Sequence, residues 1–165
     1  MQSIMSSITN SRMGKGTSVN KRQKVRVNKA LIGTTAILMK EKMLQHDSIA
    51  KAKKVLASNT AAVYPNNIDE MYCEFMTLKI MSGDYNPSAA HLSPGGTVDQ
   101  FWHAHILDTV GYAKFFKDVN PPSAEMVHHD ALKSQESDEL INKRQEKTRS
   151  VSIFVVYMMC TYSST

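Results

Sequence analysis

The chain has 165 residues, of which 42% are hydrophobic and 21% charged, and this fits one modest globular domain better than two independent cores. The net charge is +5, but residues 1–40 carry eight basic and no acidic side chains, so the remaining 125 residues have a net charge of −3. This distribution disfavours a uniformly basic nucleic-acid-binding domain and confines any polyanion contact to an amino-terminal arm.

Residues 1–34 are predicted to form a disordered basic arm, because their Ser, Thr, Asn, Gly and basic residues offer too little apolar surface to offset the entropy of ordering. Within the arm, a short cluster is a candidate for weak polyanion contact or nuclear import, with a solvated tail as the alternative: Lys21, Arg22, Lys24 and Arg26. The composition also allows an organelle transit peptide, and we favour the tail.

Secretion and membrane insertion are both disfavoured. Residues 1–16 lack the continuous apolar run of a secretory signal. Cys73 and Cys160 have no CxxC spacing, which favours a reducing compartment over a disulfide framework or a cysteine-based zinc site. The longest apolar run, 151–160, is about half of the roughly 20 residues that a membrane-spanning helix requires. We therefore expect an intracellular protein, cytoplasmic or nuclear, without a membrane segment.

Helical periodicity begins after the arm. Apolar residues recur at helical spacing over 35–58 with lysines between them, which predicts one or two amphipathic helices. A further helix is expected to start at Ile68 after the capping residue Asn67, to keep its apolar positions on one side, and to stop at Ser82-Gly83-Asp84.

The strongest periodicity predicts a single helix from Val98 to about Lys117, capped by Thr97 and ended by the double proline that follows Asn120. The polar stretch 133–150 is typical of an exposed helix, and the β-branched run 151–157 of a strand or a last buried turn. The sequence thus predicts a mainly α fold with a single small helical domain over 35–150.

Histidines concentrate around the predicted helix, since five of the six lie within residues 91–130 together with the only tryptophan. Asp99 and His103 are roughly 40° apart in helical projection, so both side chains can address one point in space. His105 lies roughly 160° from His103, on the apolar face, and the two cannot bind one metal ion from a regular helix.

His128 and His129 are the candidates for the missing ligands, because the double-proline turn can return the chain along the helix. Adjacent residues of an extended segment point to opposite sides, so we expect one of the two to face Asp99 and His103. Two histidines and one carboxylate are the donors of open iron, manganese or zinc sites. Open positions on such an ion permit water activation or oxygen chemistry.

A purely structural cluster is the alternative interpretation. Asp99 and His103 can form an i,i+4 charge pair in the first helical turn, where a carboxylate complements the helix dipole. His105 is then a buried histidine hydrogen-bonded to a carbonyl, and Trp102 a core anchor. Thr109 and Asp130 are assigned structural or supporting roles beside them.

The pattern Asp99-x-x-Trp102-His103-x-His105, followed by His128-His129-Asp130, resembles the motif of plant glycine-rich domain-containing proteins and of small eukaryotic and microbial proteins that share it. The likeness covers about residues 55–132 and implies a shared helical domain, but no established reaction. The family pattern is poorly matched after Thr148, so residues 151–165 are predicted as a divergent or poorly ordered tail.

Three functions are compatible with these observations. The first is a binding or adaptor domain, with an unidentified protein partner, whose Asp/Trp/His cluster holds a divalent zinc, iron or manganese ion. The second is a metal-dependent enzyme that uses Asp99, His103 and one of His128 and His129. The third is polyanion binding through the basic arm, with affinity that falls steeply with salt.

Overall fold

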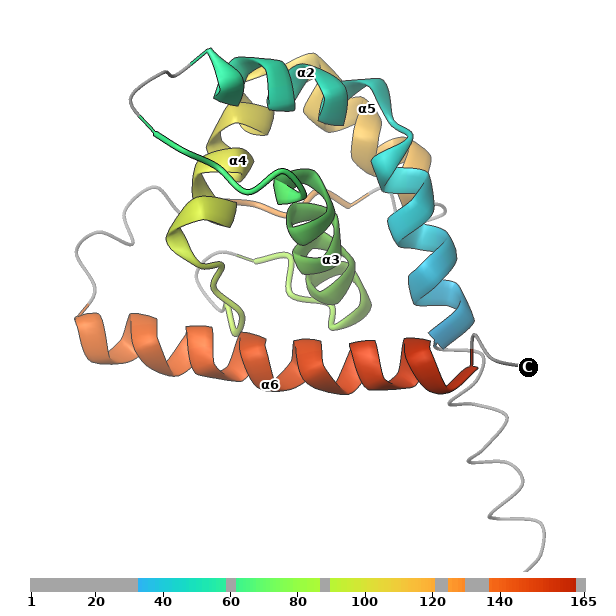
Figure 1. Ribbon diagram of the computed structural model, residues 1–165, viewed down its shortest axis with the longest axis vertical. Helices are drawn as coiled ribbons and strands as arrows, with labels where there is room; N and C mark the ends of the chain where they lie inside the picture. Colours follow the sequence, from blue (N-terminus) through green and yellow to red (C-terminus); the bar gives the residue numbers. More distant parts are fainter. Residues whose placement is uncertain (1–32, 59–61, 87–89, 121–124, 130–136, 163–165) are drawn as a thin grey trace, which may run out of the picture.

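The computed structural model describes residues 33–58, 62–86, 90–120, 125–129 and 137–162, and in 153–162 the backbone alone. All regular secondary structure in these ranges is helical, which confirms the predicted mainly α fold (Figure 1). Residues 1–32 of the predicted arm, which include its basic cluster, and Asp130 lie outside the described residues.

The chain from residue 33 to Ala57 forms two helices. Residues 33–44 are helical, so this helix begins just inside the boundary predicted for the arm, and α2 (Asp47–Ala57) follows after a short turn. His46 marks the break because it caps α2: its Nδ1 accepts a hydrogen bond from the Ser48 backbone N at 3.2 Å. Both helices bury an apolar face that includes Ala36, Met43, Ile49, Ala52 and Leu56.

α3 (Ile68–Met81) has the bounds that the sequence predicts. Asn67 is its N-cap residue, and Gly83 follows the helix with a φ of 68°, a conformation that glycine adopts without the steric cost of a Cβ. Burial extends beyond the apolar side that the sequence predicts and includes residues on other faces: Cys73, Met76, Thr77, Lys79 and Ile80. Figure 1 shows why, since α3 lies in the middle of the molecule and other helices surround it.

A charged pair lies inside the core at the end of α3. Lys79 Nζ donates to Asp84 Oδ2 at 2.7 Å, and both side chains are only 2% exposed. The Asp84 carboxylate also accepts the backbone N–H groups of His91 and Leu92, each at 3.0 Å. Burial opposes ionisation of Asp84, yet the Lys79 ammonium and the two backbone donors hold its pKa below the ordinary value. The pair thereby fixes the loop that leads into the next helix.

The single helix predicted over 98–117 is in fact two helices, α4 (Gly96–Leu107) and α5 (Thr109–Val119). The break is at Asp108, whose φ of −85° and ψ of 75° are not helical. Its carboxylate caps α5 by accepting a hydrogen bond from Gly111 N at 3.0 Å. Apolar spacing missed this break because the helical period continues through it. The local signal is Asp108 followed by Gly111, where a Cβ would collide with the capping carboxylate.

α6 (Asp138–Tyr162) runs along one side of the molecule and packs against α3 (Figure 1). The helix continues through residues 151–157, so the strand alternative for this run is wrong. Thr148 Oγ1 contacts both backbone polar atoms of Ser93, accepting from N at 3.0 Å and lying 2.9 Å from O. Gln145 Nε2 donates to Pro94 O at 3.1 Å. These hydrogen bonds connect α6 to the loop that precedes α4.

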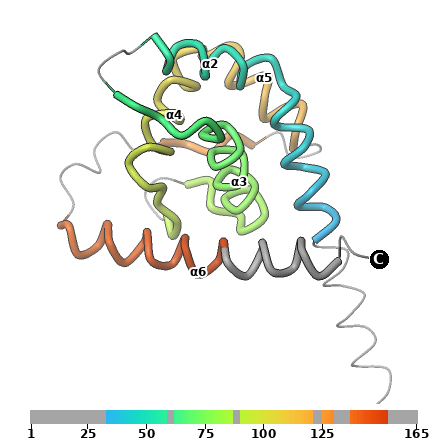
Figure 2. Tube along the Cα trace, in the orientation of Figure 1, coloured from blue at the N-terminus to red at the C-terminus, as the bar shows by residue number. Residues whose placement is uncertain are grey.

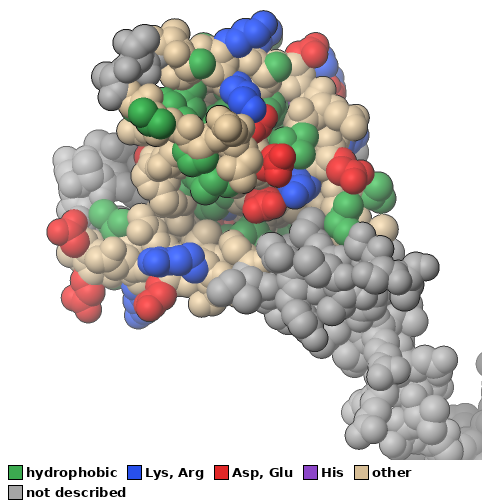
Figure 3. Space-filling view, viewed as in Figure 1, with side chains coloured by type: hydrophobic (Ala, Val, Ile, Leu, Met, Phe, Trp, Pro, Cys, Tyr) green, Lys and Arg blue, Asp and Glu red, His purple; other side chains and the backbone are tan. Residues whose placement is uncertain are grey.

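The described surface carries both signs of charge. On the face seen in Figure 3, acidic and basic side chains are interspersed. Ion pairs such as Lys40 with Glu74 at 3.0 Å and Lys53 with Asp69 at 2.7 Å join neighbouring helices. Among the helices that the structure describes, none combines the length and the apolar character needed to cross a bilayer.

Candidate metal centre

Asp99 projects from the first turn of α4, and His103 projects from the same side of the helix four residues later. The helix begins after Gly95, whose carbonyl accepts the Asp99 N–H at 2.9 Å, so the prediction of Thr97 as the cap is wrong and Thr97 lies in the first turn. The backbone N–H groups and dipole of a helix start favour a negatively charged side chain in the first turn, where Asp99 lies. One turn further on, His103 Nδ1 lies 3.6 Å from Asp99 Oδ2, the predicted i,i+4 contact.

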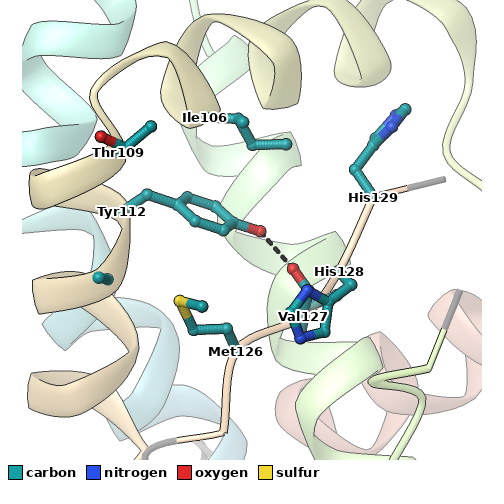
Figure 4. Close-up of a pocket in the computed structure, with 8 residues that line it drawn as sticks. Ile106, Thr109, Tyr112, Met126, Val127, His128 and His129 are labelled. Atoms are coloured by element: carbon teal, nitrogen blue, oxygen red, sulfur yellow. Dashed lines mark hydrogen bonds between the residues drawn. The ribbon is translucent and has the colours of Figure 1, made fainter. Parts of the chain in front are cut away.

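A short extended segment, residues 125–129, brings the third side chain to the site. Val127 is fully buried, and its carbonyl accepts the Tyr112 hydroxyl at 2.6 Å (Figure 4). The Tyr112 oxygen in turn accepts the indole N–H of Trp102 at 2.8 Å. His128 N donates to Tyr85 O at 3.1 Å on the other side. These bonds hold the segment, drawn in orange in Figure 2, so that His129 reaches α4.

The two consecutive histidines have different positions because the segment is extended. His128 is exposed and lies outside the cluster, whereas His129 Nε2 lies 3.0 Å from Asp99 Oδ1. The ring centres of His103 and His129 are 4.4 Å apart. One donor atom from each of Asp99, His103 and His129 lies within 4.8 Å of the other two.

The cluster is closed on one side and open on the other. The ring of Trp102, which is 2% exposed, packs edge-on against His129 with centres 4.5 Å apart. Exposure of the three polar side chains rises from 14% for His129 through 34% for Asp99 to 54% for His103. Trp102 therefore positions His129 from the core, while solvent reaches the His103 side.

The distances are close to those that a bound ion requires. Nitrogen and oxygen ligands lie about 2.0 to 2.2 Å from zinc, which places neighbouring ligand atoms roughly 3 to 3.5 Å apart. The three donor atoms lie within 4.8 Å of one another, and side-chain rotations that move each atom by roughly 1 Å bring them to this spacing. Two imidazoles and one carboxylate suit zinc, iron(II) or manganese and leave coordination positions open on the solvent side.

His105 belongs to a separate buried network. Its Nδ1 lies 2.8 Å from the Tyr72 hydroxyl and its Nε2 2.8 Å from Ser48 Oγ, so two hydroxyls take the place of the predicted carbonyl partner. Ser48 Oγ is also 2.8 Å from His46 Nδ1, which already accepts the Ser48 backbone N–H. His46 Nδ1 is therefore the acceptor of the Ser48 hydroxyl proton. It follows that His105 donates from Nε2 to Ser48 Oγ and accepts at Nδ1 from the Tyr72 hydroxyl.

This network keeps His105 neutral. Burial, reinforced by the nearby His46, lowers the pKa of His105 to about 4. Burial also raises the pKa of Tyr72 well above its ordinary value, so the Tyr72 hydroxyl keeps its proton and donates it to His105. His105 thus acts in the packing of α2, α3 and α4 and contributes nothing to the cluster around Asp99.

The remaining predicted site residues lie elsewhere. Thr109 is exposed at the start of α5, and Asp130 falls outside the described residues. Sequence reasoning gave no site role to Tyr112 or Ser48, whose contacts join residues between 10 and 57 positions apart. Such contacts depend on how separate helices pack, which the periodicity of a sequence does not indicate.

No family model, curated protein or solved structure matches the chain. The geometry and chemistry of the Asp99, His103 and His129 cluster are therefore the basis for inferring function.

Proposed function

We propose that this domain binds one divalent metal ion through Asp99, His103 and His129. The observation that carries the proposal is the convergence of their donor atoms within 4.8 Å. His129 comes from a segment that the Trp102, Tyr112 and Val127 hydrogen bonds hold in place. A cluster supported in this way is what a site for zinc, iron(II) or manganese requires, because the atoms behind the ligands set their orientation.

Under this proposal, both parts of the motif that resembles glycine-rich domain-containing proteins supply metal ligands. Asp99 and His103 come from its D-x-x-W-H-x-H part, and His129 from its H-H-D part. Trp102 joins the two parts, because its ring packs against His129 and its N–H bonds Tyr112. We propose that the two parts of this motif serve together to retain the ion.

A metal-dependent enzyme is the second candidate function. It is favoured by the 54% exposure of His103, which leaves one side of the ion accessible to water or to a ligand. Water on a bound divalent ion loses a proton far more readily than bulk water, and open coordination positions are the feature that separates catalytic from structural sites.

Titration with Co(II), whose visible absorption reports its coordination, and competition of Zn(II) with a chromophoric chelator test the proposal on the full chain. We expect one ion per chain. The changes His129→Ala, His103→Ala and Asp99→Asn should each weaken binding roughly 100-fold or more, since loss of a direct ligand exceeds the 10- to 100-fold effect of losing a supporting partner.

The neighbouring His128 supplies a matched control. It is exposed and lies outside the cluster, so His128→Ala should leave the metal affinity unchanged. Circular dichroism of each variant separates loss of the ion from loss of the fold. The proposal is overturned if the wild-type chain binds no stoichiometric ion, or if His128→Ala weakens binding as much as His129→Ala does.

A further inference from the structure

A cavity of about 300 Å³ lies between α5 and the segment 125–129 (Figure 4). Its walls are mainly apolar and are formed by Ile106, Thr109, Tyr112, Ala113, Met126, Val127, His128 and His129. Small-molecule sites are typically mainly apolar cavities of about 300 to 1,000 Å³ with a few precisely placed polar groups. The volume and lining therefore fit a small molecule better than a peptide.

The cavity adjoins the candidate metal centre. His129 belongs both to its wall and to the metal cluster, and Ile106 lies one helical turn beyond His103 on α4. In Figure 4 His129 lies at the end of the segment opposite Met126, so one end of the cavity is bounded by a residue that also belongs to the metal cluster. A molecule in the cavity can thus direct one end toward the ion.

The net charge of the metal site indicates which chemical group the molecule should direct toward the ion. A divalent ion held by two neutral imidazoles and the Asp99 carboxylate carries a net charge of +1, and a partly buried positive charge is stabilised by a monoanion. A carboxylate supplies both the single negative charge and the oxygen donors.

We infer that the cavity takes the apolar body of a small monocarboxylate whose carboxylate binds the metal ion. This inference rests on the proposed metal site and identifies the class of ligand that completes it. The volume corresponds to roughly ten waters at about 30 Å³ each, which accommodates a body the size of hexanoate.

The test measures binding of three probes to the Co(II)-loaded full chain by the change in the cobalt spectrum and by calorimetry. Hexanoate combines the carboxylate with an apolar body, acetate has the carboxylate alone, and 1-hexanol has the body alone. Because each buried methylene strengthens binding about fourfold, hexanoate should bind at least roughly 10-fold more tightly than acetate. It should also change the cobalt spectrum, whereas 1-hexanol should not.

Two variants locate the body of the ligand. Ala113→Trp places a large side chain in the wall and should abolish the preference for hexanoate over acetate without changing the Co(II) affinity. Lys117→Trp, one turn further along α5 and outside the wall, is the matched control and should keep the preference. If Ala113→Trp disturbs folding, Thr109→Phe fills the same cavity from another position on α5.

The possible outcomes separate the two proposals. Absence of Co(II) binding by the wild-type chain overturns both the metal site and the ligand class. Stoichiometric Co(II) binding without a preference for hexanoate overturns the ligand inference alone, as does a preference that survives Ala113→Trp. Hexanoate binding that leaves the cobalt spectrum unchanged overturns the contact between carboxylate and ion.

Discussion

Acidification from pH 7 to pH 4.5 should destabilise the domain through His105, and His105→Gln should remove that part of the pH dependence. In the folded chain His105 is fully buried and accepts a hydrogen bond from the Tyr72 hydroxyl, so a second ring proton has to displace that donor. In the unfolded chain the imidazole is free to bind the proton. Glutamine offers a donor and an acceptor but does not titrate in this range.

The magnitude follows from the pKa difference. The pKa of His105 is about 4 in the folded state against an ordinary value of 6.5. Between these two values the unfolded state binds a proton that the folded state does not, so the free energy of unfolding falls as the pH falls. The full contribution is present above pH 6.5 and decreases by up to about 1.4 kcal/mol per pH unit, which amounts to about 2 to 3 kcal/mol at pH 4.5.

Urea denaturation followed by the fluorescence of Trp102, the only tryptophan, measures this effect in the presence of a chelator. The free energy of unfolding is determined for both proteins at several pH values from 7 to 4.5. Histidines that share no partner with His105 contribute equally to both proteins, so the difference between the two losses reports His105 together with any change at His46, which shares Ser48 with it. If the free energy of unfolding falls equally in the wild type and in His105→Gln between pH 7 and pH 4.5, His105 is not a buried, neutral histidine in the folded state.

Two further changes test how the core supports the cluster. Lys79→Met should cost about 3 to 5 kcal/mol in urea denaturation, because it leaves the Asp84 carboxylate buried without its cation, and adding Asp84→Asn should recover part of the loss. Tyr112→Phe removes the oxygen that joins Trp102 to Val127, which should cost about 1 to 3 kcal/mol and weaken Co(II) binding. Unchanged Co(II) affinity in a folded Tyr112→Phe protein would show that these hydrogen bonds do not position His129.

Local sequence rules predicted the parts of the molecule that local interactions determine. The bounds of α3 coincide with the predicted cap position Asn67, whose side chain makes no cap hydrogen bond, and with the stop signal around Gly83. The contact between Asp99 and His103 follows from their i,i+4 spacing. Side chains of an extended segment point alternately to opposite sides, so the sequence predicted that one of His128 and His129 would supply the third ligand.

Long-range packing determined what the sequence could not predict. The side of the extended segment that faces α4 depends on burial of Val127 and on the Tyr112 hydroxyl, which belongs to another helix. The partners of His105 come from α2 and α3. The break at Asp108 is local, but apolar periodicity overlooks it because the break changes the backbone direction without interrupting the apolar spacing.

The unequal exposure of Asp99, His103 and His129 also bears on how fast an ion would exchange. His129 is packed against Trp102, whereas His103 is more than half exposed at the edge of the cluster. A competing chelator can therefore bind the ion from the His103 side while Asp99 and His129 still hold it. Exchange by this route needs no unfolding of the domain, so the rate of metal release should depend on chelator concentration rather than on global stability.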